Sequence, residues 1–478
     1  MQHTLRESTA DDIGSAVANA AAASAAWAAS DAATRSGFLR KLAEGLEAER
    51  EPLVALANEE TALGPARLNG ELDRTAFQLR AFADAVDAGE AFQVIDDPAV
   101  PGAPPAGHPR LLRVQVPLGP VAMFSASNFP FAFSVLGGDT ASALAAGCPV
   151  VVKAHPAHPL LSRAVFAISR KVAAASGVPE GVIGMVEGGS KEVGIALVRH
   201  PAIEAVAFTG SFAGGAALQK EVQDRDKPIP FFGELGSINP IVALPAALKE
   251  KGPELAKTLA ASIALGCGQF CTSPGVLIAL EGDATDRFVQ LLAQEMDAQT
   301  PHAMLSPAIR KAFDAGVARL VAHAAAKRLT TGRQDAGGPP VPNLVEVNAD
   351  AFIAHPELRH EIFGPSCIVM KAKSIREAQQ ALLAVGGSLT ATVWGAESGD
   401  ADAQAIVHSA MQIAGRVLFT GVPTGVAVTR AQHHGGPWPA STAPQTTSVG
   451  LMAMHRFLRP VALQDPPAWL AARRGVPC

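Results

Sequence analysis

The chain has 478 residues, of which 48% are apolar, 17% charged and 5% aromatic. This composition is typical of globular proteins and excludes a disordered or collagen-like chain. The 39 basic and 44 acidic residues leave a formal charge of -5, so the sequence shows no basic surface for nucleic acid or anionic lipid. The length predicts more than one folding unit.

The five cysteines indicate a reducing compartment, because an odd and sparse set in a long chain does not form a disulfide framework. The first thirty residues contain acidic side chains and lack a basic stretch before their Ala-rich part. No apolar run of about 18 residues follows anywhere in the chain. We therefore expect neither a signal peptide nor a membrane span. We also expect the protein to be cytoplasmic.

The first ninety residues predict three or four helices, because small apolar and charged residues alternate at helical spacing. Residues 8–11 resemble a capping box at the start of the first helix. The segment from 97 to 109 carries five prolines. It predicts a connector, because such a composition forms neither a helix nor a central strand.

Short apolar runs beyond residue 110 predict two series of strands. The first series covers 111–116, 121–124, 149–153, 182–186 and 205–208, and the second covers 275–280, 367–370, 391–395 and 416–420. Helical patterns lie between them, so we expect βαβ units, mostly parallel sheets and two doubly wound α/β domains. Beyond Gly421 the chain is irregular and long enough to cover a site or reach a neighbour.

Ligands of open parallel sheets bind beyond the carboxyl ends of the strands. Residues 125–130, which include Asn128, follow one predicted strand, Lys153 ends the next, and residues 209–215 follow a third. The third segment opens a helix with glycines, whose free N–H groups favour a phosphate. It lacks the GxGxxG pattern, so an ordinary glycine turn stays open there, as does a solvated surface role for Lys153.

The loop 266–275 carries two cysteines, Cys267 and Cys271, between glycines. A thiol on such a loop is accessible, so the loop predicts a nucleophile. Two small buried side chains are the alternative. A zinc pair is disfavoured, because three residues separate the cysteines and no second pair matches them.

Glu234 is the one carboxylate in the apolar, glycine-containing segment 231–237. Burial raises the pKa of a carboxyl group toward the range in which a base works near neutral pH. A carboxylate paired with a backbone amide or a lysine is the commoner alternative.

Four ordered segments resemble the signatures of the aldehyde dehydrogenase superfamily: FTGS at 208–211, FFGELGSINP at 231–240, GQFCTSPG at 268–275 and EIFGP at 361–365. The likeness runs from the N-terminal helices to the last forty residues. Within the superfamily, residues 124–159 and HHGGPWPAST at 433–442 look most similar to bacterial α-ketoglutaric semialdehyde dehydrogenases and the related NADP-linked fatty aldehyde dehydrogenases.

The resemblance implies an oxidoreductase in which Cys271 attacks an aldehyde. The Asn128 amide and the Cys271 backbone N–H would hold the resulting oxyanion. Hydride transfer to a nicotinamide then gives a thioester, and Glu234 would activate the water that hydrolyses it. We expect no metal in this site. The resemblance also implies a set of cofactor-binding residues: Lys153, Thr209, Gly210, Ser211, Glu361 and Phe363.

Two departures from the family pattern concern the oxyanion loop and the cofactor. Ser127 stands where many members have a Trp, as in the semialdehyde subgroup. Pro156 stands where many NAD-preferring members have a Glu for the ribose 2′-hydroxyl, which favours NADP. Ala213 and Ala216 supply no arginine for a 2′-phosphate. We expect use of both NADP and NAD, with a preference for NADP.

Likeness to the subgroup favours 2,5-dioxopentanoate as the substrate, with a fatty or other aliphatic aldehyde as the alternative. A cysteine-dependent acyl hydrolase is an alternative of another class, because a thiol, an oxyanion hole and a base suffice for ester cleavage. A paralogue without catalysis is not suggested, since Cys271, Glu234 and Asn128 are all present.

The resemblance implies an aldehyde-dehydrogenase-like architecture in three parts. These are a Rossmann-type dinucleotide-binding domain (1–98 and 118–236), an α/β catalytic domain (237–437) and a small β oligomerisation element (99–117 and 438–478). Alternation in 111–116 predicts an edge strand with one covered face. That strand and the C-terminal tail would pair with a neighbouring subunit, so we expect a homodimer or a homotetramer.

Overall fold

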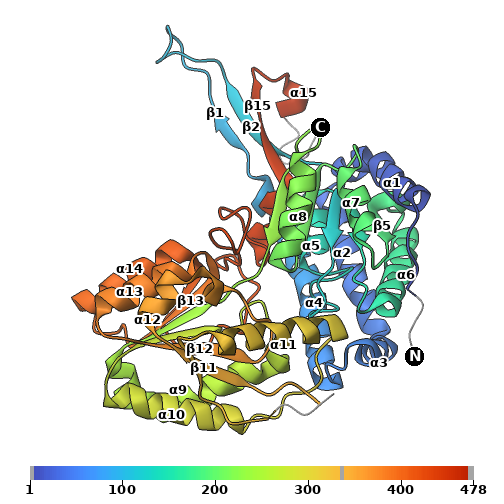
Figure 1. The fold of residues 1–478 in the computed structure, drawn as a ribbon. Helices are drawn as coiled ribbons and strands as arrows, with labels where there is room; N and C mark the ends of the chain where they lie inside the picture. Colours follow the sequence, from blue (N-terminus) through green and yellow to red (C-terminus); the bar gives the residue numbers. More distant parts are fainter. Residues whose placement is uncertain (1–4, 334–337, 472–478) are drawn as a thin grey trace. The chain divides into compact units, whose positions relative to one another are not determined.

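The computed structural model describes residues 5–333 and 338–471, which form two compact units, and Cys478 lies outside this range (Figure 1). The first unit comprises residues 1–233, 428–432 and 446–478. The second comprises residues 234–427 and 433–445. Each unit is described separately below.

Four helices open the first unit, as expected: α1 (Ala10–Ala28), α2 (Ala32–Ala48), α3 (Arg50–Thr61) and α4 (Pro65–Asp87). The capping box begins at Thr9 rather than at residue 8. Thr9 Oγ1 accepts from Asp12 N at 3.1 Å, and Thr9 N donates to Asp12 Oδ2 at 2.9 Å. The helix therefore starts with two of its otherwise unpaired amides satisfied.

The main sheet of the first unit has the strand order β5-β4-β3-β6-β7. Its strands are β3 (Val121–Phe124), β4 (Val150–Lys153), β5 (Ile183–Val186), β6 (Ala205–Thr209) and β7 (Phe231–Glu234). The connecting helices are α5 (Gly138–Ala146), α6 (Pro159–Ser176), α7 (Lys191–Arg199) and α8 (Phe212–Gln223). Strand β3 pairs in parallel with β4 and β6, and β4 with β5. Strand β3 is apolar and buried along its whole length, as expected for an inner strand of a parallel sheet.

A second, antiparallel sheet of the first unit joins distant parts of the chain. Its strands are β1 (Ile95–Asp97), β2 (Leu111–Pro117) and β15 (Leu458–Gln464). Strand β2 lies between the other two (Figure 1). The prediction of an edge strand at 111–116 was therefore wrong, because both of its sides are paired within the chain.

The second unit is built around a seven-stranded sheet of order β10-β11-β12-β9-β8-β13-β14. Its strands are β8 (Pro240–Ala243), β9 (Val276–Leu280), β10 (Ala326–Arg328), β11 (Asn343–Val347), β12 (Ser366–Ala372), β13 (Ser388–Trp394) and β14 (Ala414–Leu418). All neighbours are parallel except β10 and β11.

Helices cover both faces of this sheet (Figure 1). One apolar cluster joins Val242, Val276 and Ile278 to helices α12 (Ala349–Ala354), α13 (Ile375–Val385) and α14 (Ala401–Ile413). The other joins Ile241, Leu277 and Ala279 to α9 (Pro245–Ala264) and α10 (Asp283–Asp297). Alternate residues of a strand therefore serve opposite cores. The remaining helix of this unit is α11 (Pro307–Ala322).

The doubly wound α/β prediction is confirmed. The short 3-10 segments are η1 (Glu90–Phe92), η2 (Glu180–Val182), η3 (Leu265–Gly268), η4 (Pro356–Arg359) and η5 (Leu451–Phe457), and a last helix is α15 (Ala468–Ala471). Within the described part of the chain, no helix combines the length and the apolar character that crossing a membrane requires.

Candidate active site

The loop of Cys271 is shaped by close backbone contacts within the second unit. Gly268 has a φ of +65°, and a Cβ there would come within 2.3 Å of the Gly364 carbonyl carbon. Buried Asn239 donates from Nδ2 to the carbonyls of Cys271 (2.8 Å) and Ser273 (3.0 Å). The thiol is therefore carried by a loop that its neighbours hold in one conformation, and Cys271 stays partly exposed.

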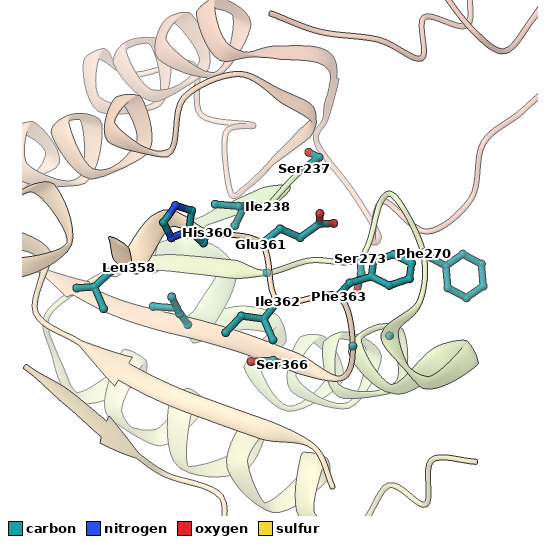
Figure 2. A pocket seen from close by; sticks show the side chains of 14 residues that line it. Ser237, Ile238, Phe270, Ser273, Leu358, His360, Glu361, Ile362, Phe363 and Ser366 are labelled. Atoms are coloured by element: carbon teal, nitrogen blue, oxygen red, sulfur yellow. The ribbon is translucent and has the colours of Figure 1, made fainter. Parts of the chain in front are cut away.

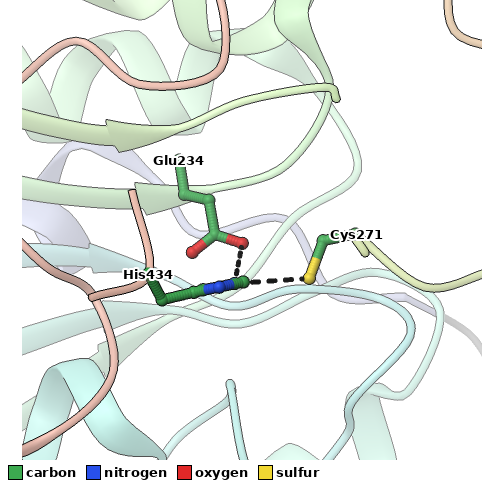
Figure 3. A group of neighbouring side chains, drawn as sticks. All are labelled: Glu234, Cys271 and His434. Carbon is green, nitrogen blue, oxygen red and sulfur yellow. Dashed lines mark hydrogen bonds and ion pairs between the residues drawn. The ribbon is translucent and has the colours of Figure 1, made fainter. Parts of the chain in front are cut away.

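Glu234 and His434 lie beside the thiol (Figure 3). His434 Nε2 is 3.0 Å from Glu234 Oε1 and 3.5 Å from Cys271 Sγ. The imidazole is fully buried and the carboxylate is 3% exposed. The structure thus brings together two of the predicted catalytic residues and adds a histidine between them.

The pKa of the Cys271 thiol is raised well above its usual value. The first cause is burial, followed by the negative charge of Glu234 and a hydrogen bond with it, and then the charge of Glu361. The resting side chain is therefore a thiol, which needs a proton acceptor before it can attack a carbonyl carbon.

His434 was not predicted from the sequence. It belongs to the segment 433–442, which runs alongside the end of β7: Leu235 N donates to Ala440 O at 2.8 Å, and Glu234 pairs with Ser441. Gly387 also allows this path, since a Cβ there would be 2.0 Å from Pro437 O. The available signal was the histidine pair inside a glycine- and proline-rich tail, because functional side chains are often found on such loops.

A hollow in the same unit is lined by two of the predicted cofactor-binding residues, Glu361 and Phe363, together with Ser237 and Phe270 (Figure 2). The segment around Glu361 lies against the one that follows Glu234. A Cβ on Gly236 would come within 2.4 Å of Glu361 Oε2, so a side chain at this position would displace the Glu361 carboxylate.

The other predicted site residues lie in the first unit, at the carboxyl ends of three neighbouring strands. Asn128 follows β3 and is 8% exposed. Lys153 ends β4, and its Nζ donates to the carbonyls of Ala154 (3.1 Å) and Gly188. Because β4, β3 and β6 are parallel neighbours, these residues share one edge of the sheet with the segment that follows β6.

That segment comprises Thr209, Gly210 and Ser211. Thr209 is the last residue of β6, and Ser211 caps helix α8, where its side chain accepts from Gly214 N at 3.3 Å. The edge thus offers an exposed glycine, a helix N-terminus and a lysine, a donor set that fits the phosphates and ribose of a dinucleotide.

Among the described residues, two groups have ligand atoms close enough to hold a metal ion. One is the Glu234, Cys271 and His434 group, and the other is formed by His323, His355 and Glu357. In the second group His323 Nδ1 accepts a hydrogen bond from Ala325 N at 3.2 Å. Its Nε2 lies 3.9 Å from Glu357 Oε1, beyond hydrogen-bond distance, and that oxygen lies 3.1 Å from His355 Nδ1 instead.

Residues 2–436 match the aldehyde dehydrogenase family. The chain is 43% identical over 451 residues to alpha-ketoglutaric semialdehyde dehydrogenase 2 of Azospirillum brasilense, covering 92% of this chain and 84% of the relative. It is 40% identical over 433 residues to an alpha-ketoglutaric semialdehyde dehydrogenase of Acinetobacter baylyi, covering 90% and 82%.

A solved structure of proline utilization A from Bradyrhizobium japonicum shares the fold with a TM-score of 0.81 at 24% identity. The match covers 96% of this chain, which spans 45% of the length of that longer chain. The protein therefore belongs to the aldehyde dehydrogenase family. It is an oxidoreductase that uses NAD(P) to oxidise an aldehyde to a carboxylate, and the acyl-hydrolase alternative is not favoured.

Proposed function

We propose that this enzyme oxidises 2,5-dioxopentanoate, the semialdehyde of 2-oxoglutarate, to 2-oxoglutarate. Two relatives at 43% and 40% identity carry the name of this activity. The contact of Cys271 with His434 and Glu234 supports the chemistry, because it joins a nucleophile to groups that can take and hold its proton.

Proton transfer from the thiol starts the reaction. His434 Nε2 carries a proton in this arrangement, because the carboxylate oxygen that it faces can only accept. Glu234 takes the thiol proton through the hydrogen bond that joins them. Once the thiolate has formed, Nε2–H lies near enough to donate to the sulfur.

The thiolate adds to the aldehyde carbon and gives a thiohemiacetal, whose oxyanion is held by the Asn128 amide and the Cys271 N–H. NAD(P)⁺ supplies the hydride acceptor that converts this adduct into a thioester. Glu234 releases the thiol proton to solvent and then removes a proton from the water that cleaves the thioester. One aldehyde, one oxidised cofactor and one water give one carboxylate, one reduced cofactor and two protons.

The preferred cofactor is NADP, with NAD also used. Pro156 leaves out a carboxylate that would repel a 2′-phosphate. Glu7 has the opposite effect: its carboxylate accepts from the N–H groups of Gly189 (2.6 Å) and Ser190 (3.1 Å) and interacts with Lys153. Specificity constants for both cofactors test this preference, and a hundredfold preference for NAD would contradict it.

We also propose that the chain divides into three parts. The dinucleotide-binding domain comprises 1–98 and 118–236, the catalytic domain 237–437, and the oligomerisation element 99–117 and 438–478. Assembly as a homodimer or homotetramer would use the antiparallel sheet of β1, β2 and β15, whose outer strands are β1 and β15. Light scattering tests the assembly.

A thiol nucleophile stays reduced in the cytoplasm, which is the compartment we propose.

The experiment that tests the function combines an aldehyde panel with both cofactors. Wild-type protein should form reduced cofactor with 2,5-dioxopentanoate at a higher kcat/KM than with a long aliphatic aldehyde. Cys271→Ala should abolish this signal and still bind the dinucleotide in a calorimetric titration. Oxidation retained by that variant, or thiol-dependent ester cleavage without any cofactor reduction in the wild type, would reject the proposal.

A further inference from the structure

Arg416 lies on β14, at one edge of the seven-stranded sheet of the second unit. Its strand runs beside the segment that carries His434, since a Cβ on Gly415 would come within 2.3 Å of the Gly435 carbonyl oxygen. His434 Nε2 in turn is 3.5 Å from Cys271 Sγ. The backbone of β14 therefore borders the part of the site that contacts the nucleophile.

The guanidinium of Arg416 holds the turn that follows its own strand. Nη1 donates to Gly425 O and Nη2 donates to Pro423 O, both at 2.6 Å. The third nitrogen, Nε, is buried and has no hydrogen-bond partner among the residues that the structure describes. A buried N–H group without a partner is destabilising, so this site favours a ligand that supplies an acceptor. Holding the turn therefore explains two of the three nitrogens and leaves Nε unexplained.

The positive charge of Arg416 has no carboxylate to balance it. Within residues 5–333 and 338–471, no Asp or Glu forms an ion pair with Arg416. Burial lowers the pKa of Arg416, and the negative charge of the Cys271 thiolate opposes this shift. Because the pKa of Cys271 is itself raised well above its usual value, the resting sulfur is neutral and the guanidinium lacks a counter-charge. A partly buried cation of this kind favours an anionic ligand.

We propose that Arg416 binds the carboxylate of the substrate through Nε and Nη2 while Cys271 is bonded to its aldehyde carbon. The inference rests on the proposed function and adds the residue that selects the substrate class, short aldehydes with a carboxylate at the far end. Nη2 keeps a second N–H besides the one that it gives to the turn. Together with Nε–H it forms a fork that matches the two oxygens of a carboxylate.

The length of a five-carbon oxo-acid suits this arrangement. Its four C–C bonds span about 5 Å. The bond to sulfur at one end and the hydrogen-bonded contact with the guanidinium at the other add about 5 Å more. The sum is close to the distance of about 10 Å over which charges interact at physiological ionic strength. The charge interaction between Arg416 and Cys271 is therefore consistent with a substrate of this length placed between them.

The test compares three five-carbon aldehydes, 2,5-dioxopentanoate, 5-oxopentanoate and pentanal, with the full-length enzyme at saturating NADP. Arg416→Gln should lower kcat/KM for the two carboxylated aldehydes about 10- to 100-fold, mainly through KM, as expected for the loss of hydrogen bonds to a charged group. Pentanal oxidation by the same variant should change less than about threefold, so it controls for folding and for the position of the turn. Arg416→Lys should fall between wild type and Arg416→Gln, because it keeps the charge without the fork.

Arg328→Gln is the matched control, because Arg328 ends β10 at the opposite edge of the same sheet and also donates to a backbone carbonyl, Gly332 O, at 2.6 Å. It should leave all three substrates unaffected. Equal losses for the three aldehydes in Arg416→Gln would overturn the inference and show that Arg416 acts on the turn or on the sulfur. An unchanged preference for the carboxylated aldehydes would overturn it as well, with the aldehyde dehydrogenase activity intact.

Calorimetric binding of 2-oxoglutarate gives a readout that does not need turnover. Arg416→Gln should weaken this binding at least tenfold relative to wild type and to Arg328→Gln. Equal affinity in all three proteins would contradict the proposed contact, whatever their activity. A wild type that binds 2-oxoglutarate through Arg416 but oxidises no aldehyde would support the carboxylate site and reject the proposed function alone.

Discussion

Removing the His434 imidazole tests the site most directly, because this side chain contacts both the nucleophile and the base. In His434→Ala, Cys271 loses the N–H donor 3.5 Å from its sulfur, and Glu234 loses its 3.0 Å partner. Hydrogen bonds to charged groups contribute about 1.5 to 3 kcal/mol, which corresponds to about 10- to 100-fold in rate. We expect kcat/KM to fall by that factor.

The assay should measure the thiol itself as well as turnover. Burial and Glu234 already hold the Cys271 pKa well above its usual value, so little thiolate is present at neutral pH. Loss of a donor to the thiolate raises the pKa further. Alkylation of Cys271 by iodoacetamide, followed by peptide mass spectrometry, should slow in parallel with kcat/KM, and its rise with pH should move to higher pH.

His408→Asn is a suitable control, since His408 is an exposed residue on α14 of the same unit. It should leave alkylation and turnover unchanged. If alkylation of Cys271 in His434→Ala keeps the wild-type rate and pH dependence while kcat/KM falls, His434 does not act on the sulfur. The assignment of the N–H donor would then be wrong.

Three other perturbations test separate parts of the site. Glu234→Gln should slow both the burst of reduced cofactor and steady-state turnover, the latter about 10²- to 10⁴-fold, because the thiol and the hydrolytic water lose the same base. A burst at the wild-type rate would show that another group takes the thiol proton. Burial raises the pKa of Glu71 to about 7. The stability contributed by its protonated carboxyl group is therefore fully present below pH 4.5. As the pH rises to about 7, the free energy of unfolding falls by up to about 3 kcal/mol. Glu71→Gln should remove this part of the fall in melting temperature between pH 5 and pH 8, and parallel curves for variant and wild type would contradict the shift. Glu7→Gln should raise the kcat/KM ratio of NADP to NAD about two- to fivefold, as expected for an exposed charge near Lys153, and an unchanged ratio would show that Glu7 does not face the ribose.

The parallel strands could be predicted well because burial on both faces leaves a continuous apolar run. The strand at Val121–Phe124 was predicted with its observed bounds. Strand β8 (Pro240–Ala243) was missed, because it starts with a proline, which favours a break. The role of β2 was wrong because its pairing with β15 joins residues more than 300 positions apart, which no local pattern contains.

The candidate site shows the same limit. Cys271 and Glu234 could be proposed because each stands in a short segment whose glycines and apolar neighbours make a reactive side chain conspicuous. Asn239 could not, because its importance comes from two hydrogen bonds to the loop of Cys271 and from accepting Ser237 Oγ at 2.8 Å. A buried amide of this kind is recognised only when its partners are known.

His434 is the strongest case, because its role depends on a tail segment that carries no regular structure. The segment reaches the thiol through backbone contacts with residues 235 and 387, which are distant in sequence and require close approach. Glycine at positions 387 and 415 leaves the space that the segment occupies. A bulkier residue at either position should therefore act like a mutation of His434, and Gly415→Ala, whose Cβ would meet Gly435 O at 2.3 Å, should slow Cys271 alkylation without touching any reacting group. If Cys271 in Gly415→Ala is alkylated at the wild-type rate, contacts other than this backbone path hold His434 in place.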